Sequence, residues 1–349
     1  MATSEADVRE ALKAVRYPGF SRDIVSFGLV KSVLVDNGDV KVQLALATND
    51  PNVPATIKRD ADQALRNIGL TNAKILIDIH APPAGAGAGG MVTTRIPGVK
   101  HTIAIASGKG GVGKSTVAAN LAVALEQTEA KVGLCDCDIY GPSISMMFGT
   151  RQRPTATEDN RIIPIEQYNL KLMSMGFLLD DTSPAILRGP MVTRYTQQFL
   201  RQVEWGTLDY LVLDLPPGTG DIQLTIVQTV ALSGAIIVTT PQEVALIDAR
   251  KAATMFEKVN VSVLGLIENM SYFISPSDNK RYDIFGSGGG EREARRLRVP
   301  LLGQIPIDIA TREAGDRGLP IAAQKEQSAV AAEFKRIAKS LRQKLDDAA

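Results

Sequence analysis

Short apolar runs rich in β-branched residues alternate with segments of helical hydrophobic periodicity from residue 98 to the C-terminus. Short runs that are apolar throughout are typical of strands buried on both faces of a sheet. Because helices separate these strands, the pattern predicts an α/β domain with a doubly wound, mostly parallel sheet, whose ligands bind beyond the carboxyl ends of the strands. The predicted strands are residues 101–107, 131–138, 208–215, 234–240, 261–267 and 300–306, and the clearest helices between them are 114–127 and 243–259.

The N-terminal region follows a different pattern, with a helix, two strands, a second helix and a third strand. Ser4 stands where it would cap the first helix, and Asn37-Gly38 is a typical two-residue turn between the first two strands. This order of elements predicts a small α+β domain. Its elements are expected within residues 4–17, 25–48, 53–69 and 72–79.

Gly, Ala and Pro dominate the stretch between these two regions, and it carries no hydrophobic periodicity. Such a composition is typical of a flexible linker. The sequence therefore predicts a small α+β domain at residues 1–80, a linker at 81–97 and the α/β domain at 98–349.

Charge and hydropathy narrow the partners. The 39 basic and 38 acidic residues leave a formal net charge of +1, so no bulk attraction to nucleic acid or to an anionic membrane is implied. The N-terminus has no basic and apolar leader, and no apolar run approaches the roughly 18 residues of a membrane span. We expect a cytoplasmic protein with neither nucleic acid nor membrane as its partner.

A phosphate-binding loop stands between the first predicted strand and helix of the α/β domain. Residues 108–115 match the pattern G-x-x-x-x-G-K-[ST] in the strand-to-helix context that this motif requires. Its glycines let backbone N–H groups face phosphates at the positive end of a helix. Lys114 is expected to neutralise the β- and γ-phosphates, Ser115 to ligate Mg²⁺ and Thr116 to reach the α-phosphate. The other predicted ATP-binding positions are Gly108, Gly110, Gly111, Val112 and Gly113.

Three carboxylates follow strands at the same predicted edge. Asp214 ends an apolar strand where a Walker B aspartate would hold the Mg²⁺ shell. Asp136 and Asp138 are two residues apart, so their side chains are expected on one face, one orienting a Mg²⁺-bound water and the other the attacking water. A turn-forming or helix-capping role remains the alternative for Asp138. The predicted Mg²⁺ ligands are Ser115, Asp136 and Asp214.

The motifs "SGKGGVGKST", "DIYGPS", "RGPM" at residues 188–191, "DYLVLDLPPGTGD", "ENMSYF" and "GGG" at 288–290 occur in this order. The chain from about residue 98 to 345 thereby resembles the Mrp/ApbC family of P-loop ATPases, iron-sulfur cluster carriers related to MinD, ParA and the nitrogenase iron protein. The N-terminal region resembles the small metal-sulfur cluster assembly domain that is often fused ahead of them.

That resemblance implies a homodimer that binds ATP and Mg²⁺ and works with iron-sulfur scaffold or recipient apoproteins. It also implies that Lys109, the extra lysine of the loop, reaches the nucleotide of the other subunit, where a second ammonium would stabilise transition-state charge. Asn269 would contact the adenine, with Pro306 and Asp308 lining its pocket. The predicted catalytic set is Lys109, Lys114, Asp136, Asp138 and Asp214.

The sequence departs from this family at the cluster ligands. Carriers normally place a C-P-x-C pair after "ENMSYF", whereas this chain has Ser275 and Asp278. Neither side chain is a usual soft ligand for a [4Fe-4S] cluster. In the N-terminal region Val53 takes the place of a thiol, and residues 16–19 replace an acidic Asp-Pro-Glu. The cluster ligands are therefore left unassigned. One hypothesis is that this chain is a nucleotide-gated adaptor and that another protein supplies the ligands.

Few soft ligands remain elsewhere, because the chain contains two histidines and two cysteines. Cys135 and Cys137 flank Asp136 in a strand, so their thiols are expected to point away from the carboxylates and into the core. A cluster shared by the Cys-x-Cys pairs of two subunits is the alternative.

A second function class follows from the C-terminal segment. Five apolar side chains fall on one helical stripe with basic residues nearby, as in MinD-like switches that position themselves on membrane or nucleoid. The favoured interpretation is a final helix packed on the sheet. The stripe consists of Val330, Phe334, Ile337, Leu341 and Leu345.

Overall fold

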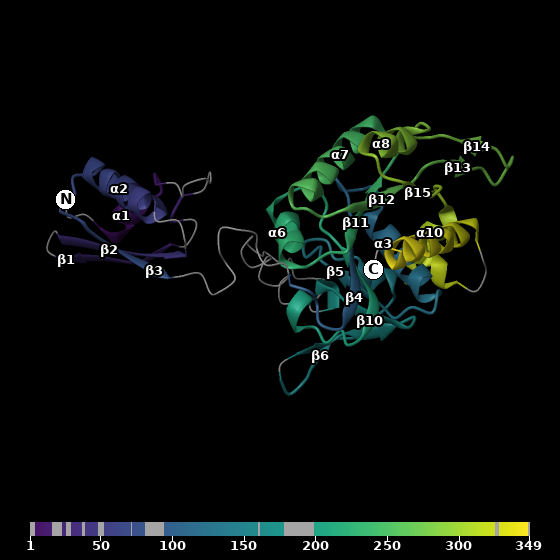
Figure 1. Cartoon of the computed structure of the whole chain (residues 1–349), viewed down its shortest axis with the longest axis horizontal. Helices are drawn as coiled ribbons and strands as arrows, with labels where there is room; N and C mark the ends of the chain where they lie inside the picture. Colours follow the sequence, from purple (N-terminus) through teal and green to yellow (C-terminus); the bar gives the residue numbers. More distant parts are fainter. Residues whose placement is uncertain are drawn as a thin grey trace. The chain divides into compact units, whose positions relative to one another are not determined.

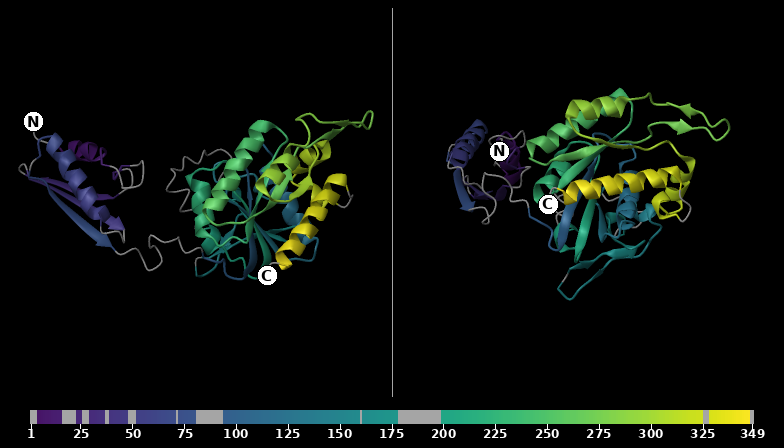
Figure 2. Two further views of the ribbon diagram at one scale, coloured as in Figure 1. Left: turned by 45° about the horizontal axis from the view of Figure 1, so that its top comes forward. Right: turned by 45° about the vertical axis from the view of Figure 1, so that its right-hand side comes forward.

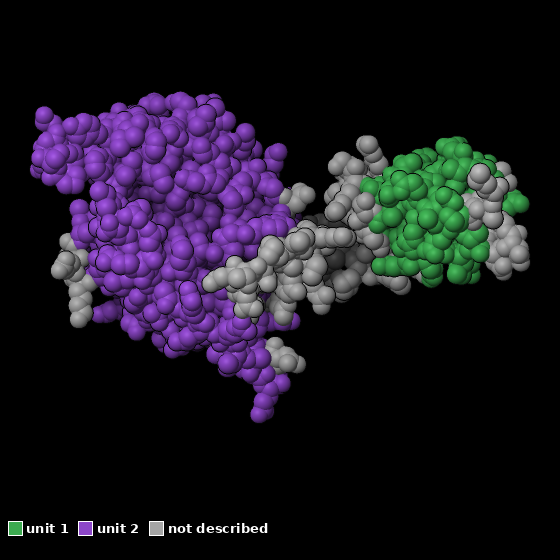
Figure 3. Space-filling model, turned by 180° about the vertical axis from the view of Figure 1, so that it is seen from behind, with its two compact units in different colours: residues 1–92 green, residues 93–349 purple. Residues whose placement is uncertain are grey.

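The protein was analysed as a computed structural model (Figure 1). It divides into two compact units, Met1–Val92 and Thr93–Ala349, which Figure 3 distinguishes by colour and which we describe separately. The structure describes residues 4–15, 23–25, 29–36, 39–47, 52–70, 72–80, 94–159, 161–177, 199–324 and 328–347.

The described residues of the first unit form a three-stranded sheet with two helices. β1 and β2 pair antiparallel, and β3 adds to β2 in parallel. Ser4 caps the first helix as predicted, because its hydroxyl accepts from Asp7 N while the Asp7 carboxylate accepts from Ser4 N. The Asn37-Gly38 turn and residues 16–19 lie outside the described residues. The elements are α1 Glu5–Leu12, β1 Val30–Asp36, β2 Asp39–Ala47, α2 Asn52–Asn67 and β3 Lys74–His80.

Val53, at the position where the family resemblance implies a thiol, is buried in the core of this unit with Leu12, Leu44 and Ile57. A valine side chain in such a cluster contributes to packing through its apolar surface. The position therefore supports the small domain's core.

The second unit is built on an eight-stranded sheet in the order β15-β12-β11-β4-β10-β5-β9-β8. Every neighbouring pair is parallel except β8 and β9. All six predicted strands are present, and the predicted doubly wound, mostly parallel sheet is confirmed. The strands are β4 Val99–Ala106, β5 Val132–Asp136, β8 Ile165–Gln167, β9 Leu170–Met173, β10 Leu208–Asp214, β11 Gly234–Thr239, β12 Val263–Glu268 and β15 Leu301–Gln304.

Helices cover both faces of this sheet, with α3 and α10 on one face and α6 and α7 on the other (Figures 1 and 2). Successive side chains of a strand point to opposite faces of the sheet, so each strand contributes to the hydrophobic core on both faces. In β4, Ile103 and Ile105 pack in the cluster that contains α3, and Ala104 and Ala106 pack in the cluster on the other face. The helices are α3 Lys114–Glu126, α4 Ile144–Met147, α6 Asp221–Thr229, α7 Glu243–Lys258, α8 Gly289–Leu297, α9 Ile309–Asp316 and α10 Ala329–Asp346, with 3-10 turns η1 Met175–Phe177 and η2 Ile321–Ala323.

Short strands that the sequence did not predict complete the unit. They pair in two antiparallel hairpins, of which β13 with β14 extends from the body of the unit in Figures 1 and 2. Their bounds are β6 Thr155–Ala156, β7 Ile162–Ile163, β13 Phe273–Ile274 and β14 Arg281–Tyr282.

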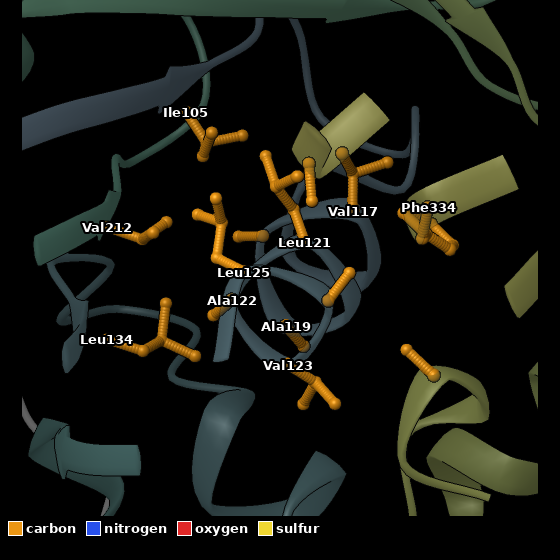
Figure 4. Packing of buried hydrophobic residues seen from close by; sticks show 14 of the residues in the cluster. Ile105, Val117, Ala119, Leu121, Ala122, Val123, Leu125, Leu134, Val212 and Phe334 are labelled. Atoms are coloured by element: carbon orange, nitrogen blue, oxygen red, sulfur yellow. The ribbon is translucent and has the colours of Figure 1, made fainter. Parts of the chain in front are cut away.

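The helix behind the phosphate-binding loop is held from both sides. Figure 4 shows side chains of α3, among them Val117 and Leu121, packed between Ile105 and Val212 of the sheet and Phe334 of α10. The apolar stripe of α10 is buried along its whole length, against α3 and against strand β15 of the sheet, which agrees with the favoured interpretation of a final helix packed on the sheet. Among the described helices, none combines the length and apolar character needed to cross a bilayer.

Candidate nucleotide-binding site

The loop between β4 and α3 has several positions that favour glycine, among them Gly108 and Gly113. Gly113, the residue that precedes α3, has φ 78°, and a Cβ there would lie 2.2 Å from Asn269 Nδ2. A Cβ on Gly108 would lie 2.0 Å from the carbonyl oxygen of Asp248 in α7. Any side chain would displace these neighbours, and Gly113 also uses the left-handed region that favours glycine. The loop is therefore wedged between α7 and the end of β12.

A pocket of about 250 Å³ opens over this loop at the carboxyl end of the sheet, and we call it the phosphate pocket. It brings together most of the predicted phosphate-binding residues. Gly108 lies against α7 and Val112 is buried, and neither lines the pocket. The lining residues are Ser107, Lys109, Gly110, Gly111, Gly113, Lys114, Ser115, Thr116, Asp138, Ser143, Met147 and Pro217.

Lys114 and Asp214 form a buried ion pair at the base of this pocket. Lys114 Nζ donates to Asp214 Oδ1 and lies 3.3 Å from Ser115 Oγ. Burial raises the pKa of Asp214, and the Lys114 ammonium opposes that rise. Asp214 Oδ2 is shielded from solvent and has no hydrogen-bond partner. An orphaned carboxylate oxygen beside the Ser115 hydroxyl is a donor set that suits Mg²⁺ and its water shell.

Asp136 anchors the loop that follows β5. Its Oδ1 accepts from Asp138 N at 3.1 Å, and its Oδ2 accepts from Ser143 N at 3.0 Å, Ile144 N at 3.2 Å and Ser174 Oγ at 3.0 Å. Burial, and next the nearby Asp214 carboxylate, raise the pKa of Asp136 to about 7. Asp136 lies behind the loop and does not line the phosphate pocket. Its role as a Mg²⁺ ligand stays a prediction.

Asp138 lines the phosphate pocket and also stabilises the turn after it. Its Oδ1 accepts from Gly141 N at 3.2 Å, which is the turn-forming contact given above as the alternative. Both interpretations fit its position, because Oδ2 takes no part in that hydrogen bond. The catalytic role of Asp138 stays a prediction.

A second, more apolar pocket of about 390 Å³ adjoins the first and shares Gly113, Thr116 and Met147 with it. Asn269, Pro306 and Asp308 all line it, so the structure brings together the residues expected around an adenine. Asn269 Nδ2 donates to Val112 O at 2.8 Å, which ties this apolar pocket to the phosphate-binding loop. The Asp308 carboxylate accepts from Thr311 N at 2.7 Å and caps α9.

Several side chains at the site escaped the sequence prediction. Ser143 lies within the quoted "DIYGPS" motif, which could have drawn attention to it. Met270 directly follows Asn269 and also lines the apolar pocket. Ser174 and Phe285 carry no local signal, because they reach the site from distant segments.

Comparison with protein families agrees with this geometry. The family model described as "NUBPL iron-transfer P-loop NTPase", of the ParA type, matches residues 98–342. The chain belongs to this family. A second family model, "Iron-sulfur cluster assembly protein", matches residues 5–77. The resemblance inferred from the motifs is therefore confirmed for both regions.

One named relative matches the full length of this chain, and a second matches about two thirds of it. An iron-sulfur cluster carrier protein of Synechocystis is 43% identical over 356 aligned residues, covering 100% of this chain and 99% of the relative. The mouse iron-sulfur cluster transfer protein NUBPL is 50% identical over 228 residues, which cover 65% of this chain and 72% of that protein.

Solved structures match the nucleotide-binding unit. A nucleotide-binding protein of Archaeoglobus fulgidus in complex with ADP is 37% identical, with a TM-score of 0.60, and covers 69% of this chain and 94% of its own. The cell division ATPase MinD of Pyrococcus furiosus is 25% identical, with a TM-score of 0.53 over 70% of this chain and 99% of its own.

This member of the NUBPL family has a hydrogen-bonded turn at Ser275 and Asp278, the positions where the family resemblance implies a C-P-x-C pair. Asp278 accepts from Lys280 N at 3.2 Å through Oδ1 and from Tyr282 Oη at 2.8 Å through Oδ2. Ser275 Oγ lies 2.8 Å from Ser277 Oγ. Hydrogen bonds within the turn lower the pKa of Asp278, Ser275 first among them. The oxygens at these positions stabilise the tip of the β13–β14 hairpin.

The two cysteines of this family member lie in the core, as expected. Cys135 and Cys137 are buried in the cluster that includes Met173 and Leu213, and their Sγ atoms are 3.9 Å apart. The hydrogen bond with Cys135, and next burial, raise the pKa of Cys137.

Within the described part of the chain, no group of three or more His, Cys, Asp or Glu residues could hold a metal ion. The motif at residues 188–191 lies outside that part.

Proposed function

We propose that this protein is a Mg²⁺-dependent ATPase that works in iron-sulfur cluster assembly or transfer to apoproteins, as an adaptor that does not hold the cluster on its own hairpin. Its membership of an iron-transfer P-loop NTPase family supports the general role. The observation that carries the ATPase part is the phosphate pocket with the buried Lys114–Asp214 pair at its base, joined to an apolar pocket of a size suited to a nucleobase.

ATP would bind across both pockets, with its phosphates over residues 108–116 and its base beside Asn269. Lys114 would exchange Asp214 for the β- and γ-phosphates, since a polyanion offers the ammonium more negative charge than one carboxylate. Mg²⁺, held near Ser115 and Asp214, would neutralise charge that develops on the transferred phosphoryl group. Asp138 would orient the attacking water from the rim of the pocket, while Asp136 would fix the loop that carries Asp138.

Lys109 supports a second part of the proposal, a homodimer with shared active sites. It lines the phosphate pocket and is half-buried, while its carbonyl accepts from Ser107 Oγ at 2.9 Å. An additional ammonium at this rim would stabilise the transition-state charge of the partner's nucleotide much as an arginine finger does. Partners of the dimer would be an iron-sulfur scaffold and recipient apoproteins.

The proposal that another protein holds the cluster rests on the hydrogen bonds at the tip of the β13–β14 hairpin. Ligation of iron by Asp278 would require its carboxylate to give up the hydrogen bonds to Lys280 N and Tyr282 Oη. Oxygen is also a poor match for the soft iron sites of a cluster, which thiolates normally occupy. Another protein would therefore supply thiolates for the cluster substrate, and nucleotide-driven changes of this chain would bring it to or release it from that partner.

Anaerobic reconstitution with iron and sulfide tests the adaptor proposal. We expect wild type to retain no cluster and the double variant Ser275→Cys, Asp278→Cys to retain one, since it restores the C-P-x-C spacing. The readouts are iron per dimer and the visible absorption band, with ATP hydrolysis measured on the same samples. A cluster in wild type that is lost in Cys135→Ser, Cys137→Ser would move the site to β5 and overturn the proposal. Loss of ATPase activity in Lys114→Ala is the control for the nucleotide site.

A further inference from the structure

The apolar pocket is closed on one side by the two ends of the segment that carries the β13–β14 hairpin. Met270 precedes this hairpin and Phe285 follows it, and both line the pocket together with Asn269. A Cβ at Gly113 would lie 3.6 Å from Met270 Cε, so this side chain lies beside the phosphate-binding loop. The hairpin thus shares two wall residues with the proposed nucleotide site.

The base of the hairpin is fixed to the same wall through its backbone. Ile307 N donates to Tyr272 O at 2.7 Å, and Phe273 and Ile307 form a parallel bridge. Ser271 N donates to Ile305 O at 2.9 Å. Ile305 and Ile307 line the apolar pocket on either side of Pro306. A change in the position of this wall is therefore transmitted directly to the first strand of the hairpin.

Glu268, the last residue of β12, fixes the other end of the hairpin segment, where α8 begins. Its buried carboxylate accepts from Ser271 Oγ at 2.6 Å and Gln304 Nε2 at 2.8 Å, and from Gly290 N at 2.5 Å at the start of α8. Because a buried carboxylate with three donors resists displacement, β12, β15 and α8 form a fixed frame. Between Ser271 and Gly290, the hairpin segment lies outside this frame and exposes Ile274, Tyr282 and Ile284.

We propose that Phe285 packs on the base of the bound nucleotide and, with Met270, couples occupation of the apolar pocket to the position and order of the β13–β14 hairpin. This inference rests on the proposed function, since it uses the same nucleotide site. An aromatic ring is the side chain best suited to cover the face of a purine, with stacking worth about 1–3 kcal/mol per base. By linkage, any ligand that binds the hairpin in its nucleotide-bound position raises the affinity for nucleotide, and nucleotide raises the affinity for that ligand by the same factor.

The hairpin segment on which this coupling acts also exposes apolar side chains. Ile274 and Tyr282, on the two strands, and Ile284, just after β14, expose apolar area on a segment that extends from the body of the unit (Figure 2). A two-stranded hairpin is marginally stable by itself, so its order depends on what packs at its base. Filling the apolar pocket places a purine against Phe285 at that base, and the hairpin then becomes better ordered.

Hydrogen exchange of the full chain, with and without saturating ADP, tests this coupling. ADP should slow exchange of the hairpin amides at residues 273–284 by about tenfold or more, corresponding to about 1.4 kcal/mol of local stabilisation. In Phe285→Ala, ADP should bind more weakly, and at saturation the hairpin should exchange as in the nucleotide-free protein. The phosphate-binding loop should still be protected in this variant.

Met146→Ala is the matched control, because Met146 lines the same pocket from α4, away from the hairpin. It should weaken ADP binding while saturating ADP still protects residues 273–284. Hairpin protection that survives in Phe285→Ala at saturation would overturn the inference, as would wild type that binds ADP with no change in the hairpin. Failure of the proposed function would look different, since no ADP would bind and the phosphate-binding loop would not be protected.

Discussion

Lys114 Nζ is hydrogen-bonded to Asp214 Oδ1 where neither side chain has significant access to solvent, with 6% and 0% of their surfaces exposed. The cation of the phosphate-binding loop is therefore neutralised by the carboxylate that ends β10. The pair holds the loop lysine in place, and under the proposed function the phosphates of ATP would displace the carboxylate to reach it.

The first prediction concerns the stability of this pair. Lys114→Met leaves the Asp214 carboxylate buried and unpaired, so we expect a loss of about 3–5 kcal/mol in the free energy of unfolding at pH 8. The double variant Lys114→Met, Asp214→Asn should recover most of that loss, because the charge that lacked a partner is gone. Denaturant titrations of both single variants and the double variant give the interaction energy. Strictly additive losses would contradict a direct pair.

A second prediction is a pH dependence that originates at Asp136, whose carboxyl faces Asp214 and, at longer range, Lys114. The folded protein keeps the Asp136 proton up to a pKa of about 7, whereas the ordinary value of 3.8 applies in the unfolded chain. Between these values the folded state binds more protons, so Asp136 makes stability fall as the pH rises, by at most about 1.4 kcal/mol per pH unit. Above the folded-state pKa its contribution becomes constant.

Unfolding of the protein free of nucleotide and Mg²⁺, measured between about pH 5 and 8, checks this slope. In Asp136→Asn the slope should flatten. Its absolute stability should also fall, because an amide group cannot accept from Asp138 N, Ser143 N, Ile144 N and Ser174 Oγ together. An unchanged slope in the variant would assign the pH dependence to another group.

Ser143 gives a third prediction. Its hydroxyl is shielded from solvent without a hydrogen-bond partner and does not cap α4, although the residue lines the phosphate pocket. An unsatisfied hydroxyl is costly, and a terminal phosphate would satisfy it with a bond worth about 1.5–3 kcal/mol. We expect Ser143→Ala to lower affinity for Mg²⁺-ATP by roughly tenfold or more and to leave ADP affinity unchanged.

Calorimetric titration with a slowly hydrolysed ATP analogue and with ADP separates these effects. Ser143→Thr keeps the hydroxyl and should restore ATP binding. Ser145→Ala removes a hydroxyl from α4, the short helix that follows Ser143, at a residue that does not line the pocket, and it should bind both nucleotides as wild type does. Equal losses for ATP and ADP in Ser143→Ala would refute a contact to the terminal phosphate.

The fourth prediction separates the ATPase proposal from a membrane-binding switch. Phe334 is fully buried in the contact between α10 and α3, so Phe334→Ala should cost about 3–5 kcal/mol of stability. Lys339→Ala, at an exposed position of the same helix, should change stability by less than about 0.5 kcal/mol. Wild type should not co-sediment with anionic vesicles in the presence of ATP. If the stripe bound membrane, Phe334→Ala would reduce vesicle binding and leave stability unchanged.

Local sequence was sufficient for the framework of the site. The central strands are continuous apolar runs, and their period and length distinguish them from the helices between them. The loop at residues 108–115 has its geometry set by its own glycines and by the helix it begins, so a local motif predicts it. The two- to four-residue strands β8, β9, β13 and β14 were missed, because such short segments show no periodicity.

The contacts that define the site's chemistry were decided by tertiary structure. Asp214 lies opposite Asp136 because β10 pairs with β5 in register, and the same strand end brings it to Lys114, 100 residues away in sequence. Ser174 reaches Asp136 from the end of β9, and Phe285 reaches the apolar pocket from beyond the hairpin. The sequence by itself determined the residues that can bind phosphate. Only the packing of distant segments decided that Asp214 pairs with Lys114, that Asp136 anchors its loop and that Asp214 Oδ2 has no hydrogen-bond partner. The reason is that burial and hydrogen bonding depend on neighbours that no local pattern encodes.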